Sequence, residues 1–458
     1  MNPSAATHTA TPPSVTELAL WREQFLHGQR DTEGFEDRCA AFPYSSVLAT
    51  FHRFGKDGVP GAYLQYLDAL EREISALGPV TDSPAYGRLR GFFCGLLDKH
   101  RKQYCYDSYI GSSIIEQVMS CPAMTFEEVW RERTRQVVAL VSDIVHFECL
   151  TYLGEMPRQS VQLVSKRVGC KRIHGGVHAV KTFGAAVPEL LHDSGLESLA
   201  MAWKTVHGEG DAALLRRTAR VAQTIIGRLP DETRQMIALT MLPVSTDHDE
   251  YMFIRSVQAF EMIFVMLASG FRETIHRLTE NRLPEAIDAT WAMTGTIRTS
   301  LSFFRVLNTM PSENFLRFRH LTDGASAIQS RQYKWIEVLA AHPSEKRIMS
   351  EGFETVPTVR DAYRQGLRNI EDAFNDCRRT ASPSSLEGCK AALLALDKQF
   401  VAWKRSHVNV VMRALGAVTG TGGTAGLVYL QQYSTTRLFP FLYREDSRES
   451  RHVAAMTP

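Results

Sequence analysis

The chain has 458 residues, enough for a sizeable core, and its 44% hydrophobic and 22% charged residues are typical of a globular protein. Because 52 Lys and Arg nearly balance 50 Asp and Glu, the charge gives no reason to expect nucleic acid or an anionic membrane as a partner. Eight scattered cysteines without a CxxC pair exclude a disulfide scaffold and favour reduced thiols in a cytoplasmic protein.

Residues 1–45 are predicted to form a disordered N-terminal tail. The opening, MNPSAATHTATPPS, is rich in Thr, Ala, Pro and Ser, and it lacks the positive and apolar regions of a secretory signal. No unbroken apolar run approaches the roughly 18 residues that a membrane helix needs, and the best stretch, 262–268, is far too short. We therefore expect neither a signal peptide nor a membrane segment.

The rest of the chain is predicted to be all-α. Apolar residues recur at three- and four-residue spacing in segments such as 126–153, 212–229 and 250–307, the last as two helices broken near 281–284. We expect a helical region of unclear role over 46–240, a second domain over 241–443, and a polar, disordered tail over 444–458.

A zinc site is one possibility within 46–240. Cys170, His174 and His178 fall at four-residue steps, which would place three suitable ligands on one helix face. However, Gly175 and Gly176 disfavour a helix there, and no fourth ligand lies nearby in the sequence. Zinc is therefore the weaker alternative.

The segment 249–261 has an aromatic face. Phe253, Val257 and Phe260 share one side of the predicted helix and would make a wall for an aromatic ligand. Ordinary core packing is the alternative.

The segment 310–319 supplies a cation beside aromatic rings. Phe315, Phe318 and Arg319 can share one side of a helix, where an arginine can clamp a carboxylate through two parallel hydrogen bonds. Ser326 follows in the run 324–330, which reads GASAIQS. The alternative is a solvated, basic helix end.

His407 lies in the middle of an apolar helical stripe formed by Leu393, Leu396, Phe400, Trp403, Val410 and Ala414. A metal ion together with one hydrogen-bond acceptor would satisfy both nitrogens of a buried imidazole, although a core histidine bonded to protein groups is the alternative. Thirteen residues later, Gly420 and Thr421 open a loop with four glycines, which suits close approach to an anionic ligand.

Taken in order, these segments resemble the tryptophan 2,3-dioxygenase family over about residues 247–443. The matching elements are Asp249-Glu250 with Phe253-Ile254, then Phe318-Arg319, then Ser326 to Ser330, then Trp403 to His407, and finally Gly420 to Gly423. Upstream, residues 62–70 look like the family's early Tyr-Leu helix, which reaches into a neighbour's pocket in the tetramer. About 170 residues would then be an insertion.

The resemblance implies a helical haem domain in a homotetramer, with haem b held by His407 as the proximal ligand of the iron. It assigns the substrate carboxylate to Arg319, and the ammonium and carboxylate groups to Thr421 beside Gly420. Phe253, Phe315 and Ser326 would line the substrate and O₂ side.

Two positions depart from the family. Val257 aligns with the distal histidine that hydrogen-bonds the indole nitrogen, and Ala327 replaces a glycine. The leading hypothesis is cleavage of the indole 2,3-bond of L-tryptophan by O₂ to give N-formylkynurenine. The alternatives are a biosynthetic relative that oxygenates another aromatic amino acid or a tryptophan derivative, and a non-catalytic protein that binds haem or an amino acid.

Overall fold

A computed structural model describes residues 14–27, 34–77, 83–112, 114–115, 124–156, 163–206, 208, 210–415 and 427–443. Within these ranges every regular element is a helix and no β-strand occurs, which confirms the predicted all-α fold class. The tail over 444–458 and the glycine loop with Gly420 and Thr421 lie outside the described residues.

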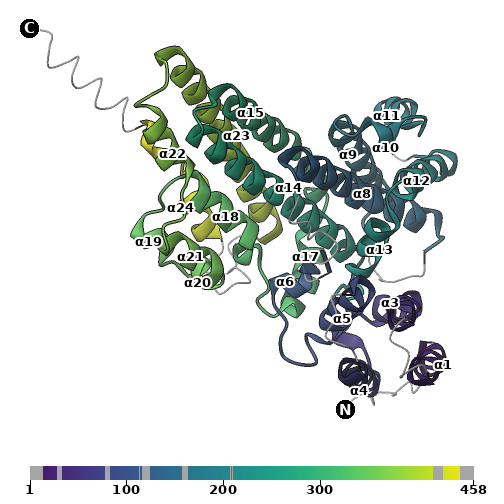
Figure 1. Ribbon diagram of the computed structural model, residues 1–458. Coiled ribbons are helices and arrows are strands. Elements are labelled where there is room, and N and C mark those ends of the chain that lie inside the picture. The colour runs from purple at the N-terminus through teal and green to yellow at the C-terminus, as the bar shows by residue number, and fades with distance from the viewer. Residues whose placement is uncertain are drawn as a thin grey trace, which may run out of the picture.

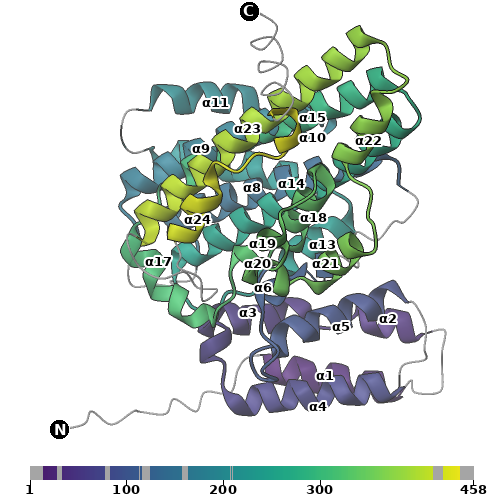
Figure 2. The same ribbon diagram turned by 90° about the vertical axis from the view of Figure 1, so that its left-hand side faces the viewer.

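The first helices gather at one end of the molecule (Figure 2). They are α1 (Ser14–His27), α2 (Phe35–Ala40), α3 (Tyr44–Phe54), the 3-10 turn η1 (Lys56–Gly58), α4 (Gly61–Leu77), α5 (Pro84–Leu97) and α6 (Tyr106–Tyr109). The short α6 leads from this group to the body of the molecule.

The described part of residues 1–45 is largely helical, so the prediction of a disordered tail is wrong for residues 14–27 and 34–45. In α1, Leu18, Trp21 and Phe25 are buried, and the indole Nε1 of Trp21 donates to the Arg38 carbonyl over 3.0 Å. The guanidinium of Arg22 donates twice to the carboxylate of Glu73 on α4. Such short helices are stabilised by tertiary contacts, which a short run of apolar residues in the sequence does not reveal.

The middle helices pack around α8, which lies among α9, α12 and α14. They are α8 (Phe126–Leu153), α9 (Lys166–Gly184), α10 (Pro188–Leu191), α11 (Leu196–Thr205), α12 (Ala212–Gly227) and α13 (Asp231–Leu239). A capping box starts α8, because the Thr125 hydroxyl accepts the Glu128 N–H while the Glu128 carboxylate accepts the Thr125 N–H.

Helix α9 continues through the two glycines that disfavoured it in the sequence. A Cβ on Gly176 would lie 2.5 Å from Cγ2 of Val145, so the glycine lets the backbones of α9 and α8 approach closely. His174 stacks on Trp203, and the Cys170 sulfur accepts the Gly210 N–H. No group of three or more metal-binding side chains occurs among the described residues, so the zinc alternative gains no support.

The remaining helices begin with the largely buried α14, which packs against α15, α16, α17, α18 and α22 (Figure 1). They are α14 (His248–Thr279), α15 (Leu283–Ser300), α16 (Phe303–Leu307), α17 (Ser312–Arg319), η2 (His320–Thr322), η3 (Ala327–Gln329), α18 (Arg331–Ala340), α19 (Glu345–Ile348), α20 (Glu351–Glu354), α21 (Pro357–Arg364), α22 (Ile370–Cys377), α23 (Pro383–Leu415) and α24 (Leu427–Ser434). The predicted break near 281–284 falls between α14 and α15.

The expected boundary near residue 240 does not separate two cores. Buried apolar residues from Leu18 to Leu442 form one continuous cluster, and α8 packs along α14. Helices α8 and α14 are each long and apolar enough to cross a membrane by length and composition. Neither contains a long unbroken apolar run, so the sequence did not lead us to expect this. Since 67% and 78% of their most apolar windows are buried inside the protein, core packing accounts for this character.

Replacing Gly176 with alanine is expected to lower the melting temperature, because the added methyl group meets Val145 and overpacking typically costs about 1–3 kcal/mol. Gly295, inside α15, is the matched control, since a Cβ there meets nothing within 4 Å. Gly295→Ala should raise stability by about 0.5–1 kcal/mol. Thermal unfolding followed by circular dichroism checks both, and an unchanged midpoint for Gly176→Ala would contradict the close packing of α8 and α9.

Candidate functional site

One face of α14 is less buried than the rest of the helix. Phe253 and Val257 are half-buried, whereas their neighbours Ile254 and Ser256 are buried. The Ser256 hydroxyl contacts the sulfur of Met252, one turn earlier in α14, at 3.7 Å. Val257 therefore shares the half-buried character of Phe253, four residues earlier, whereas Ser256 is buried.

Helix α17, which ends at the predicted carboxylate clamp Arg319, packs against this face. It contacts both α14 and α23. The rings of Phe315 and Phe318 lie 5.4 and 5.5 Å from the ring of Phe253, so aromatic side chains join α17 to α14. Arg319 ends α17, and partial burial lowers the pKa of its guanidinium. A cation in such partly dehydrated surroundings gains strongly from a carboxylate ligand.

His407 lies on α23 beside two aromatic rings. Its imidazole stacks against Trp403 at 5.5 Å and Phe304 at 6.4 Å between ring centroids. Burial lowers the pKa of His407 to about 4, so the ring is neutral at physiological pH. No hydrogen bond joins either ring nitrogen to another residue in the described part of the chain. A neutral imidazole with available nitrogens is the form that ligates a metal.

Trp403 is the centre of an aromatic cluster between α14, α16 and α23. Its ring centroid lies 5.5 Å from those of Phe260 and Phe264 and 5.6 Å from that of Phe304. Its indole N–H is buried and meets no acceptor among the described residues. The sequence analysis did not single out Phe304, although the Phe303-Phe304 pair before α17 was an available signal.

These observations fit the haem group that the resemblance implies. A haem needs apolar and aromatic walls, an axial ligand such as neutral histidine, and polar partners at its carboxylate edge. Phe260, Phe304 and Trp403 form an aromatic cluster next to His407, which would be the axial ligand that the resemblance implies. The unsatisfied indole N–H of Trp403 is a buried donor that an acceptor on a bound group would satisfy.

The loop after α17 contains the short turn η3. Ser326 caps the turn η3, where its N–H donates to the side chain of Gln329 over 3.3 Å. Ala325 belongs to a small apolar cluster against which Phe253 and Val257 pack. Ser326 thus directly follows Ala325, which lies in the same apolar cluster as the half-buried Phe253 and Val257 of α14.

A tyrosine-bearing segment does lie against α14, but it is α6. The hydroxyl of Tyr106 donates to Glu261 over 2.6 Å, that of Tyr109 donates to Glu250 over 3.3 Å, and Gln258 donates to the Ile110 carbonyl over 3.0 Å. Residues 62–70, which we matched to the family's Tyr-Leu helix, lie in α4 and pack against α5. The Tyr106-x-x-Tyr109 spacing, which places both hydroxyls toward α14, is the feature of the sequence that marks this contact.

Two carboxyl groups are buried beneath this segment. Burial raises the pKa of Glu261 to about 7, although hydrogen bonds from Tyr106 and Ser330 oppose the shift. Burial likewise raises the pKa of Glu250 to about 7 against hydrogen bonds from Ser245 and Val244. Glu261 also borders a cavity of about 360 Å³ between α6, α8, α14 and α18. Both carboxyls therefore titrate near neutral pH.

Known proteins resemble part of the chain, although no family model matches it. A tryptophan 2,3-dioxygenase of Bradyrhizobium diazoefficiens is 30% identical over 244 residues, covering 44% of this chain and 85% of the relative. That of Anaeromyxobacter dehalogenans is 26% identical over 234 residues, covering 44% and 88%. That of Xanthomonas oryzae is 25% identical over 248 residues, covering 46% and 82%. Less than half of this chain thus corresponds to most of each relative.

Replacing Glu261 with glutamine is expected to stabilise the protein at pH 8 and to change little at pH 5. A carboxyl whose pKa rises from 4.5 to about 7 on folding contributes stability that is complete below pH 4.5 and is lost as the pH rises through 7. Glutamine stays neutral, so the gain at pH 8 should be roughly 1–3 kcal/mol.

Glu337→Gln is the opposite control. Although burial alone would raise its pKa, Lys334 and Arg347 lower the pKa of Glu337, so its loss should destabilise the protein at pH 8. Melting temperatures at both pH values check these signs. Destabilisation by Glu261→Gln at pH 8 would show that the carboxyl is not held neutral.

Proposed function

Because this chain belongs to the tryptophan 2,3-dioxygenase family, we propose that it is a haem-dependent dioxygenase that cleaves the indole 2,3-bond of L-tryptophan to give N-formylkynurenine. The observation that carries the proposal is the neutral His407 beside the buried indole N–H of Trp403, on a helix that contacts the arginine-bearing α17. Proteins of this family bind haem, and O₂ is the co-substrate.

His407 would hold haem b through a ring nitrogen, within the aromatic surroundings of Phe260, Phe304 and Trp403. When bound, the haem would supply the activation of oxygen. The low pKa of His407 favours ligation, because no proton has to be removed from the ring at neutral pH.

Substrate recognition is assigned to α14 and α17. Arg319 would bind the carboxylate of the amino acid, while Phe253 and Phe315 would pack against its aromatic ring. Ser326 would lie on the substrate and O₂ side, and Gly420 and Thr421 would complete the amino-acid contacts. An amino acid held by its carboxylate and its ring has a fixed orientation, which is what a site-selective oxygenation requires.

A second candidate function rests on Val257. Its side chain shares the half-buried face of α14 with Phe253 and has no atom that accepts a hydrogen bond. An indole nitrogen would gain no anchor there, so a biosynthetic relative that oxygenates another aromatic amino acid or a tryptophan derivative is the alternative. A non-catalytic protein that binds haem or an amino acid is the third reading.

We also propose that the protein is a cytoplasmic homotetramer that binds neither nucleic acid nor a membrane.

Replacing His407 with alanine is expected to abolish haem binding, and with it the formation of N-formylkynurenine from tryptophan, O₂ and a reductant. The matched control is His174→Ala, since His174 also stacks on a tryptophan but lies on α9. Absorption spectra of the purified variants measure haem content, and kynurenine-type absorbance measures product. Undiminished haem in His407→Ala would refute the ligand assignment, whereas haem without product in the wild type would favour the alternatives.

Val257→His is expected to restore discrimination against 1-methyltryptophan relative to tryptophan. The imidazole would accept the indole N–H, and the methyl group would block that hydrogen bond, at a cost of roughly 0.5–1.5 kcal/mol in relative binding or kcat/KM. Ser256→Ala is the control for register, because Ser256 faces Met252. A change in selectivity in Ser256→Ala but not in Val257→His would place the ligand against Ser256 instead.

A further inference from the structure

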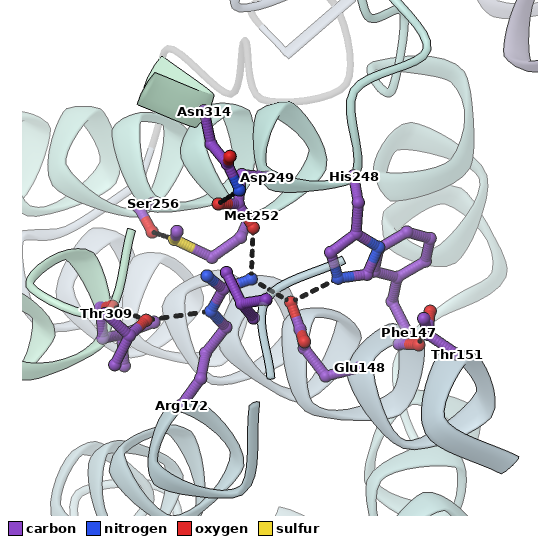
Figure 3. A network of polar contacts seen from close by, with 12 residues as sticks. Phe147, Glu148, Thr151, Arg172, His248, Asp249, Met252, Ser256, Thr309 and Asn314 are labelled. Atoms are coloured by element: carbon purple, nitrogen blue, oxygen red, sulfur yellow. Dashed lines mark hydrogen bonds and ion pairs between the residues drawn. The ribbon is translucent and has the colours of Figure 1, made fainter. Parts of the chain in front are cut away.

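Arg172 of α9 stands at the centre of a buried polar network (Figure 3). Its Nη1 donates to Glu148 of α8 over 2.6 Å and to Asp249 of α14 over 2.8 Å. Its Nε donates to the Thr309 hydroxyl over 2.9 Å. The nearby His248 lies 3.1 Å from Glu148. One guanidinium thus joins two helices of the N-terminal part to the start of α14 and to the segment that precedes α17.

The network continues into α17. The second oxygen of Asp249 accepts a hydrogen bond from the Asn314 amide over 2.8 Å, and Asn314 immediately precedes Phe315. The side-chain Oδ1 of Asn314 accepts from Arg317 over 3.0 Å, and Arg317 also donates to Asp247 over 3.0 Å. Through Thr309, Arg172 therefore holds the segment that leads into α17. Through Asp249, it holds the first turn of α17.

Helix α17 depends on such contacts for its position. It has only eight residues, fewer than an isolated helix needs to be stable. Pro311 precedes it and gives no side-chain cap. The same helix carries Phe315 and Arg319, which our proposed function assigns to substrate binding. Any rotation of α17 would move both side chains together.

The charges of the network are strongly coupled. Although burial alone would raise it, the Arg172 and His248 neighbours hold the pKa of Glu148 at about 2. The exposed fraction of Arg172 is 0%, so shortening its side chain leaves two buried carboxylates incompletely paired. Such a change would be transmitted to the groups that share those carboxylates, including Asn314.

We propose that Arg172 is a positioning residue for amino-acid recognition: through Thr309 and the Asp249–Asn314 hydrogen bond, it sets the orientation of α17 and hence of the Arg319 clamp. The inference rests on the proposed function. It gives the N-terminal part of the chain, which has no assigned role, a direct part in substrate specificity.

Arg255 provides a matched control. It is as buried as Arg172, and it also joins α8 to α14, by donating to Asp143 over 2.6 Å. Its other partners are Thr240, Gln258 and the Ile237 carbonyl, none of which belongs to α17. Arg255→Lys therefore disturbs the same helix interface without disturbing the clamp.

The test compares the full-length haem-loaded wild type with Arg172→Lys, Arg255→Lys and Arg319→Lys. Titrations followed by the haem absorption band give the Kd values of tryptophan and of tryptamine, which lacks the carboxylate. Arg172→Lys should lower the preference for tryptophan about tenfold, as Arg319→Lys should, with haem content unchanged. Arg255→Lys should lower the melting temperature and leave the preference as in the wild type. Equal preferences in the Arg172 and Arg255 variants would overturn the proposal.

Hydrogen exchange of α17 is the second readout, and it needs neither haem nor substrate. Exchange should be faster over 312–319 in Arg172→Lys than in Arg255→Lys, and equal rates would overturn the proposal. If Arg172→Lys does not fold, Asn314→Ala cuts the same link without removing a buried charge, and it should show the same two changes. Failure of the wild type to bind haem or tryptophan would instead refute the proposed function, and the exchange comparison would still decide whether Arg172 holds α17.

Discussion

The whole structure depends on burying a helix that is not wholly apolar. Helix α14 is enclosed by other helices, yet it carries the polar side chains Asp249, Glu250, Arg255, Gln258 and Glu261 into the interior. Each needs a partner, because a buried polar group without one costs about 1–3 kcal/mol or more. The partners come from segments as distant as α6, α8 and α9. The need to pair the buried polar side chains of α14 therefore fixes the positions of these segments.

The side chains of α14 contact two different parts of the protein. Several of its polar groups bind the N-terminal helices α6, α8 and α9, whereas Phe253 packs against α17 and Phe260 packs against α16 and α23. Scaffold and candidate site thus share one helix, and the N-terminal helices α6, α8 and α9 pack against it. This explains why the N-terminal part has one core in common with the rest.

Local sequence patterns predicted those features of the site that lie within a single helix. The apolar stripe around His407, the Phe-Arg pair ending at Arg319 and the face of Phe253 and Val257 all follow from three- and four-residue spacing. The Arg172 contacts could not be predicted this way, because they join residues 24, 77 and 137 positions apart. For the same reason the sequence indicated a boundary near residue 240, where the structure has a shared interior.

That shared interior has a consequence for synthesis. Glu148 receives its contact with His248 only after 100 more residues have been added. At about 5–20 residues per second, the ribosome needs roughly 5–20 s for that stretch. During this interval α8 and α9 have been made, but the apolar surface and the carboxylates that α14 covers stay in water. The nascent chain is then a natural substrate for chaperones, and the half of the protein that is made first completes its packing only when the family-like half arrives.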